Sequence, residues 1–218
     1  MSKITFAALG TEQLGISMLS AIAKREGHQV GLAFSASLFH DRFNLELPWL
    51  SPYFDDTQEV FKAIEKQQPD VLCFSPLTST YQWSLGIAEY AKKMNPNIKT
   101  VFGGVHASAV PHLLLQRPVI DYVVVGEGDV AFPKIIKAIE NGDDETPIVN
   151  TKFKSKTGRI ITGIQSGFIQ DLDSLPFFDK PLWEDYVRLG DVYMTMASRG
   201  CPYRCSFFFN NFFAKLPE

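Results

Sequence analysis

Short apolar runs alternate with longer amphipathic stretches over the first 142 residues, and this alternation restricts the fold more than any other feature. The runs are apolar throughout, as is typical of strands that helices cover on both faces. The amphipathic stretches have the length of crossover helices, so the pattern predicts an α/β domain with five parallel strands. The expected strands are residues 4–9, 29–34, 71–75, 100–102 and 122–125, the expected helices are residues 13–26, 57–67, 81–94, 109–116 and 129–141, and residues 39–56 are the expected long loop.

The character of the sequence changes after residue 142. Two short segments, residues 148–154 and 159–164, flank a turn at residues 156–158, and they predict a β-hairpin. A proline-containing linker follows and extends through Pro181. A further strand is expected at residues 192–197, and it leads directly into a cysteine motif. The sequence therefore predicts three parts: a domain over 1–142, a hairpin and linker over 143–190, and the start of another domain over 191–218.

Composition and charge argue against several classes of function. The formal net charge is −3 with a pI of about 5.8, and the basic residues are scattered, so a nucleic-acid partner is not expected. No stretch reaches the roughly 18–20 apolar residues of a membrane span, and the amino terminus lacks the features of a signal peptide. Three cysteines, an odd number, are typical of a reducing compartment. We therefore expect a soluble, cytoplasmic protein without a membrane partner.

Glycine, hydroxyl and acidic residues follow three of the predicted strands. The carboxyl ends of parallel strands meet at one edge of a sheet, so these residues are expected to share a pocket for a polar ligand. A structural interpretation stays open for each loop, because glycine is common in βα turns and hydroxyl groups often cap helices. The candidate ligand-binding residues are Ser75, Thr78, Gly103, Gly104, His106, Gly126, Glu127 and Gly128.

Three other residues have simpler interpretations. His106 is a candidate metal ligand, but a single histidine after two glycines is more often a hydrogen-bonding or packing residue. Asp129 is expected to stabilise the first turn of a helix through the helix dipole. Cys73 lies within an apolar run, where a cysteine acts as a small hydrophobic residue.

The order of several motifs resembles that of cobalamin-dependent radical SAM enzymes. Their B12-binding domain is similar to the first part of this chain, and their linker and cluster loop are similar to the second part. The resemblance extends over almost the whole chain. The motifs that carry it are GHQV at 27–30, Ser75 with Thr78, VFGGVH at 101–106, DYVVVGEGD at 121–129, DLDSLP at 171–176 and SRGCPYRC at 198–205.

The resemblance implies a Rossmann-like, flavodoxin-type doubly wound domain that binds cobalamin over its strand ends. It also implies that the eight candidate residues line the cobalamin site. In this family a partial (β/α) barrel follows, which cleaves S-adenosylmethionine at a [4Fe–4S] cluster. The loop at residues 10–15 reads GTEQLG and lacks the DxHxxG pattern of other cobalamin domains. We therefore expect no histidine from this loop beneath the cobalt.

The cluster motif departs from the family pattern CxxxCxxC. Cys201 and Cys205 occupy the first two positions, but Phe208 occupies the third and has no lone pair to give to iron. We therefore do not expect a stable cluster or the cleavage of S-adenosylmethionine. A zinc site is the alternative, yet two cysteines supply only half of a tetrahedral ligand set. Since a complete barrel takes about 250 residues, the last part of this sequence is expected to be only a stub of one.

The sequence leaves three hypotheses for function. The first is a cobalamin-binding protein without catalytic activity of its own. The second is one fragment of a split radical SAM methyltransferase or cyclase that needs a separate polypeptide for its barrel. The third is a flavodoxin-like module that binds another ligand. Five phenylalanines between residues 207 and 213 predict self-association or contact with such a barrel polypeptide, because their apolar surface needs cover.

Overall fold

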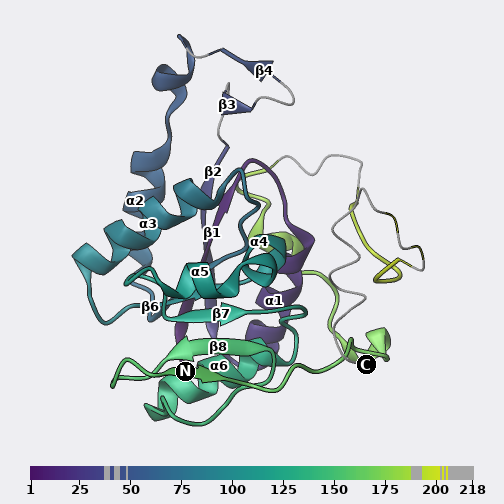
Figure 1. Ribbon diagram of the computed structural model, residues 1–218. Helices are drawn as coiled ribbons and strands as arrows, with labels where there is room; N and C mark the ends of the chain where they lie inside the picture. Colours follow the sequence, from purple (N-terminus) through teal and green to yellow (C-terminus); the bar gives the residue numbers. More distant parts are fainter. Residues whose placement is uncertain are drawn as a thin grey trace.

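The computed structural model describes residues 1–36, 40–41, 45–47, 49–187, 193–201, 203 and 205. Five parallel strands form the centre of the sheet, in the order β2-β1-β5-β6-β7 (Figure 1). Among these strands the order is 2-1-3-4-5, which is that of flavodoxin-type folds, so the predicted fold class is confirmed. The strands are β1 (Lys3–Leu9), β2 (Gln29–Ser35), β5 (Val71–Phe74), β6 (Lys99–Phe102) and β7 (Tyr122–Val124).

The predicted hairpin joins the same sheet. Its strands are β8 (Thr151–Lys154) and β9 (Ile160–Thr162), and β8 pairs antiparallel with β7. The pairing places Tyr122 opposite Phe153, with the two rings stacked at a centroid distance of 5.1 Å. The sheet is therefore mixed and seven-stranded, whereas the sequence predicted only its five parallel strands.

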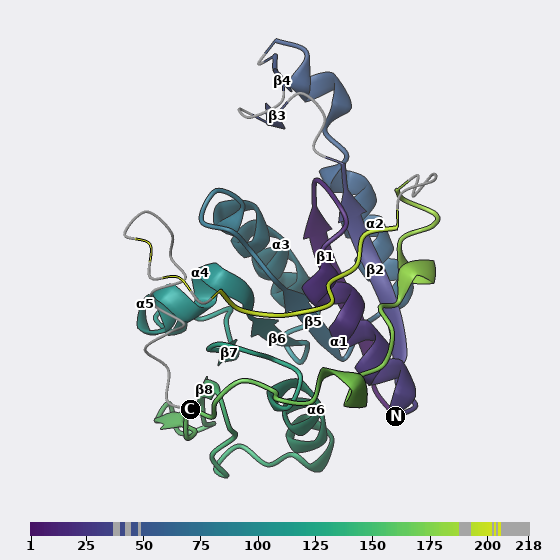
Figure 2. The same ribbon diagram turned by 90° about the vertical axis from the view of Figure 1, so that its right-hand side faces the viewer.

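Helices cover both faces of the sheet (Figures 1 and 2). Alternate residues of β1 point to opposite faces: Phe6 packs in the core with Ile16 and Phe132, while Ala7 packs with Ile64. Two separate hydrophobic cores therefore fix the sheet between its helices. The helices are α1 (Leu14–Arg25) and α6 (Ala131–Asn141) on one face, and α2 (Thr57–Gln67), α3 (Tyr81–Met94), α4 (Gly104–Ala109) and α5 (Pro111–Leu115) on the other.

The region predicted as one helix at 109–116 differs from expectation. Helix α4 already begins at Gly104, and a break at Val110 separates it from α5. Val110 precedes Pro111, and the proline ring disfavours helical backbone in the preceding residue, so Val110 has a φ of −133°. Because α4 begins at Gly104, His106 lies within a helix rather than in a loop.

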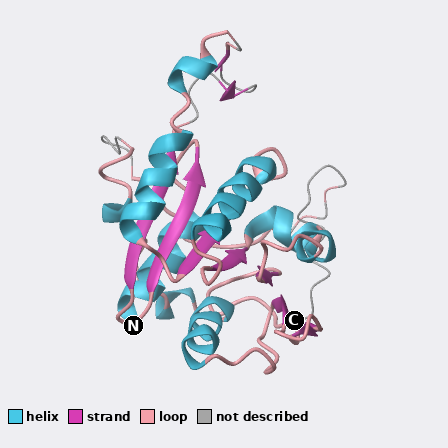
Figure 3. Cartoon of the chain, turned by 90° about the vertical axis from the view of Figure 1, so that its left-hand side faces the viewer, coloured by secondary structure: helices cyan, strands magenta, loops and turns pink. Residues whose placement is uncertain are grey.

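The predicted long loop at 39–56 contains short regular elements in its described part. These are β3 (His40–Asp41), β4 (Leu45–Glu46) and the 3-10 helix η1 (Ser51–Phe54). Figures 1 and 3 show that they form an arm that projects beyond the sheet.

The segment after β9 returns across α1 (Figure 2). It includes the 3-10 helices η2 (Leu172–Ser174) and η3 (Lys180–Leu182). Trp183 is fully buried there, and its indole nitrogen donates a hydrogen bond to Ser17 Oγ at 2.8 Å. The predicted linker is therefore packed against the first domain along this part.

The strand predicted at 192–197 is wrong for its described residues. Residues 193–197 have no partner strand and run as an irregular segment over the carboxyl ends of the sheet (Figure 2). Residue 192, Phe208 and the phenylalanine-rich stretch at 207–213 lie outside the described residues. Among the helices described, none is long and apolar enough to cross a membrane.

Candidate functional site

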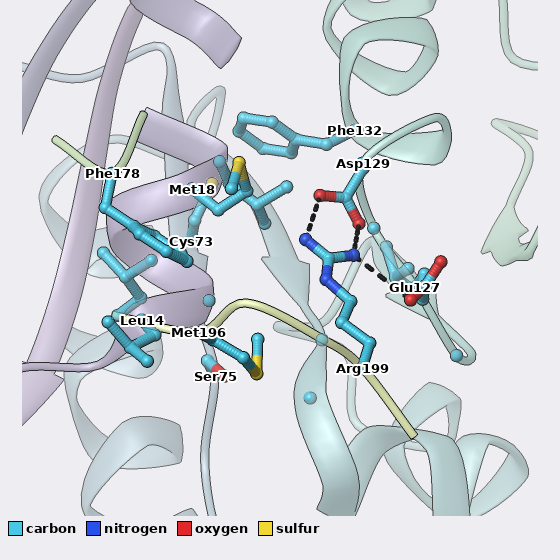
Figure 4. A pocket seen from close by; sticks show the side chains of 18 of the residues that line it. Leu14, Met18, Cys73, Ser75, Glu127, Asp129, Phe132, Phe178, Met196 and Arg199 are labelled. Carbon is cyan, nitrogen blue, oxygen red and sulfur yellow. Dashed lines mark hydrogen bonds and ion pairs between the residues drawn. The ribbon is translucent and has the colours of Figure 1, made fainter. Parts of the chain in front are cut away.

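A cavity of about 940 Å³ lies over the carboxyl ends of the parallel strands (Figure 4). Its walls come from β1, β5, β6 and β7, and it includes the place where the strand order reverses, between β1 and β5. This is the position at which open α/β sheets bind their ligands. Apolar side chains line much of it: Phe6, Leu14, Ile16, Met18, Leu19, Val101, Val124, Phe132, Phe168, Phe178 and Met196.

Two glycines in the cavity wall have backbone conformations that other residues rarely adopt. Gly104 has a φ of +79° and Gly126 a φ of +83°. A Cβ atom on Gly104 would lie 2.7 Å from Ser75 Oγ, which is closer than real Cβ atoms come to other atoms. The chain needs glycine at position 104 both for its conformation and for space, so the backbone here can approach a ligand directly.

Ser108 connects these two glycine loops. Its hydroxyl donates to the carbonyl oxygen of Gly104 at 2.9 Å and accepts from the amide of Gly126 at 2.9 Å. Ser108 is fully buried, so water does not compete for these two hydrogen bonds. The sequence prediction missed Ser108; its four-residue spacing from Gly104 on a helix was the available signal.

A partly buried ion-pair cluster lies at one side of the cavity (Figure 4). Arg199 binds Asp129 through two nitrogen–oxygen contacts of 2.8 and 3.0 Å, and it donates to Glu127 at 3.1 Å. The side chain of Asp129 is only 6% exposed. The hydrogen bonds that Arg199 donates to Asp129, together with the negative charge of Asp129, raise the pKa of Arg199 further above its already high value. Arg199 therefore stays charged at any physiological pH.

The expected role of Asp129 at a helix start is wrong. Helix α6 begins at Ala131 with Val130 as its N-cap, and its first turn contains no acidic residue. The Asp129 carboxylate instead pairs with Arg199, because a charge this deeply buried needs a partner. Glu127 has a second contact as well, since it accepts a hydrogen bond from the amide of Ile169 at 2.8 Å.

The structure brings six of the eight candidate residues to one cavity. These are Ser75, Gly103, Gly104, Gly126, Glu127 and Gly128. Thr78 and His106 are not among the residues that line it.

Thr78 and His106 contact each other instead. Thr78 Oγ1 lies 3.0 Å from His106 Nδ1, and the His106 ring lies against Tyr81 at a centroid distance of 4.6 Å. His106 lines a second, smaller hollow together with residues of α5. Burial lowers the pKa of His106, so the ring is neutral near pH 7. No grouping of three or more His, Cys, Asp or Glu residues within the described chain has the arrangement of a metal site.

The cysteines occupy different environments. Cys73 is buried in the wall of the cavity, and burial raises the pKa of its thiol, so it remains protonated. Cys201 is exposed and lies at the cavity mouth, and Cys205 is exposed as well. The Cys73 thiol is therefore inert, whereas Cys201 is open to reagents.

The apolar and polar side chains that line the cavity suit a large amphiphilic cofactor. Its depth is apolar, while Ser75, Glu127, Ser198 and Arg199 bring polar groups to its wall and mouth. Among the described residues that line it there is no histidine. A ligand held here would bury an apolar part beside the aromatic rings and place its hydrogen-bonding groups along the glycine loops.

Comparison with known proteins identifies similar chains. The model of the B12 binding domain family matches residues 7–136. An uncharacterized methyltransferase of Pyrococcus horikoshii is 28% identical over 197 residues, which is 88% of this chain and 42% of the relative. Hopanoid C-3 methylase of Methylococcus capsulatus is 30% identical over 208 residues, which is 91% of this chain and 36% of the relative. The chain thus spans less than half the length of these relatives.

Solved structures share the fold. The cobalamin-dependent S-adenosylmethionine radical enzyme OxsB, solved with aqua-cobalamin and S-adenosylmethionine bound, matches 82% of this chain and 24% of its own with a TM-score of 0.60 and 14% identity. The radical S-adenosylmethionine methyltransferase TsrM of Kitasatospora setae matches 75% of this chain and 30% of its own, with a TM-score of 0.57 and 15% identity. At these identities the likeness establishes the fold alone.

Proposed function

The chain belongs to the family of B12-binding domains, and we propose that it holds cobalamin in the cavity over the strand ends. The observation that carries this assignment is the pair of glycine loops beside the strand-order reversal. The backbone of Gly104 and of Gly126 is in the left-handed region, and a Cβ atom on Gly104 would force the Ser75 hydroxyl group to move. Glycines without a Cβ in the wall of a cavity allow a ligand to come very close to the backbone.

Different residues of the cavity contact the apolar and the polar parts of the cofactor. Phe6, Met18 and Phe132 provide an apolar surface for the aromatic base of the cofactor. Ser75 and the loop amides are the donors and acceptors for its carboxamide side chains. When bound, cobalamin supplies the cobalt chemistry that side chains lack.

We propose that no histidine among the described residues of the cavity wall binds the cobalt. The described residues of the cavity wall include no histidine, and the loop GTEQLG at 10–15 contains none. His106 is engaged with Thr78 and lines the separate hollow. Since we also propose that the cofactor's own aromatic base lies against Phe6, Met18 and Phe132, bound cobalamin should have the base-off type of visible spectrum.

A [4Fe–4S] cluster does not fit the residues of this chain. Such a cluster needs three thiolates, and the motif supplies only Cys201 and Cys205, with Phe208 in the third position. We therefore propose that the chain binds cobalamin without radical chemistry of its own. The alternative is a split methyltransferase or cyclase, in which another polypeptide brings the barrel, and the five phenylalanines of 207–213 are the proposed contact. The three cysteines favour the cytoplasm as its compartment.

Retention of the cofactor tests the proposal. The purified protein is incubated with hydroxocobalamin, desalted, and its visible spectrum is recorded. We expect about one cobalamin per chain with a base-off type spectrum. A parallel incubation with flavin mononucleotide tests the flavodoxin-like alternative, and retention of the flavin in place of cobalamin would overturn the assignment.

A further inference from the structure

A short segment of chain lies across the mouth of the cavity. We define residues 193–201 as the mouth segment; they run over the strand ends from the side of β2 toward α4 (Figure 2). The residues of this segment that line the cavity are Met196, Ser198, Arg199, Gly200 and Cys201. The mouth segment therefore forms the outer wall of the proposed cobalamin site.

Charged contacts hold the mouth segment at two places. At one end Arg199 pairs with Asp129 and Glu127. Near the other end, Lys180 Nζ donates to the carbonyl oxygen of Met194 and also binds Glu12 Oε1 at 2.5 Å. The Lys180 and Glu12 side chains are 6% and 3% exposed, so this second contact is anchored in the protein interior.

Between these contacts the segment has little apolar burial. Met194 and Met196 are both 43% exposed, and Tyr193 is 63% exposed. No strand pairing includes the segment among the pairs that the structure describes. Its position therefore depends mainly on the two charged contacts, and a segment held in this way opens at much lower cost than the core.

The size of the cofactor favours such an opening. Cavities of roughly 300–1,000 Å³ take drug-sized ligands, and this one measures about 940 Å³ with the Arg199 side chain in its wall. Cobalamin is considerably larger than a drug-sized molecule. We therefore expect it to fill the cavity only after Arg199 and Met196 move from their present positions.

We propose that the mouth segment is a lid and that the pairing of Arg199 with Asp129 and Glu127 is its latch. The lid opens when these contacts break, admits cobalamin, and retains it when they form again. Arg199 suits this role because its planar guanidinium forms a two-point contact with a carboxylate, which lysine cannot reproduce. The inference rests on the proposed cobalamin site and adds a residue that controls the rates of entry and release.

Binding kinetics test the latch. Association of hydroxocobalamin is followed by stopped-flow absorbance, and release is followed after a chase, for the wild type, Arg199→Ala, Arg199→Lys and Asp129→Asn. We expect both the association rate and the dissociation rate to increase about tenfold in Arg199→Ala. A tenfold larger opening equilibrium constant corresponds to a free energy of opening that is lower by about 1.4 kcal/mol. Arg199→Lys should be intermediate. Arg159→Ala is the matched control, since Arg159 forms an exposed pair with Glu145.

A second measurement needs no cofactor. Trypsin cuts after Arg199 only when the Arg199 side chain leaves Asp129 and Glu127, so the rate of cleavage after Arg199, identified by mass spectrometry, reports opening. We expect faster cleavage after Arg199 in Asp129→Asn than in the wild type and in Arg159→Ala, at a temperature at which circular dichroism shows all three proteins to be folded. Equal cleavage and equal rates of binding would overturn the latch while leaving the cobalamin site intact. Failure of the wild type to bind cobalamin, with cleavage still accelerated in Asp129→Asn, would instead overturn the site and leave the lid in place.

Discussion

Two adjacent glycines in the cavity wall give a stringent test of the local geometry. Gly104 has a φ of +79°, and a Cβ there would lie 2.7 Å from Ser75 Oγ. Gly103 has a φ of −129°, and its nearest neighbour would be Val124 Cβ at an ordinary 3.8 Å. The same substitution by alanine should therefore have different effects at two positions that are one residue apart.

The magnitudes follow from these two conformations. A non-glycine residue in the left-handed region costs about 1–3 kcal/mol, against which alanine gains about 0.4–1 kcal/mol by restricting the unfolded chain. The contact with Ser75 adds to the cost, so Gly104→Ala should lower the free energy of unfolding by about 1–2 kcal/mol. Alanine at position 103 also restricts the unfolded chain, which stabilises the protein, but alanine is a poorer N-cap than glycine, which destabilises it. These two effects nearly cancel, so Gly103→Ala should change the free energy of unfolding by less than about 0.5 kcal/mol.

Urea unfolding followed by circular dichroism measures both variants. We expect unchanged slopes, a lower midpoint for Gly104→Ala, and a fall in its thermal midpoint of about 2–8 °C. The pair Gly104→Ala and Ser75→Ala completes a double-mutant cycle, in which removal of the Ser75 hydroxyl should recover part of the loss. Equal stability of Gly103→Ala and Gly104→Ala would refute the assignment of a left-handed, crowded position at Gly104.

Three further expectations concern the cysteines and His106. Burial raises the pKa of the Cys73 thiol, so Ellman's reagent should modify Cys201 and Cys205 rapidly at pH 7.5 and Cys73 only after unfolding; three rapid thiols would contradict this. Burial lowers the pKa of His106 below 6.5, so an NMR titration should show a midpoint below that value. The unfolded chain then takes up the proton first, so His106 should reduce stability as the pH falls below 6.5, and His106→Gln should remove that contribution. Anaerobic reconstitution with iron and sulfide should give well under four irons per chain; a stoichiometric cluster in the wild type would refute the argument from Phe208.

The sequence predicted the central sheet because its strands are continuous apolar runs. Val71–Phe74 is buried at every position, and such a run has few alternatives to a strand between two helical layers. The convergence of Ser75, Gly104 and Gly126 was predictable too, since parallel strands end at one edge. These predictions depend on local pattern and on one general rule of topology.

Features that depend on contacts between distant residues were not predictable in this way. Arg199 and Asp129 are separated by 70 positions, and nothing in the local pattern of either one indicates the other. Residues 193–197 have the composition of a strand, but a strand also needs a partner, which the described structure does not provide. Thr78 and His106 follow strand ends as expected, yet His106 lies within α4 and lines a different hollow, and Thr78 contacts His106 there instead of lining the cavity.

The central claim is that the cavity over the strand ends binds cobalamin, and equilibrium titration of a cavity-wall variant tests it most directly. Gly103→Val adds a branched side chain to the wall at a backbone conformation that valine accepts, and Gly86→Val is the control at an exposed position of α3 with open space around it. Hydroxocobalamin should bind the wild type and Gly86→Val with equal Kd, and Gly103→Val at least about tenfold more weakly, a loss of about 1.4 kcal/mol. Equal Kd values for all three proteins would contradict the claim.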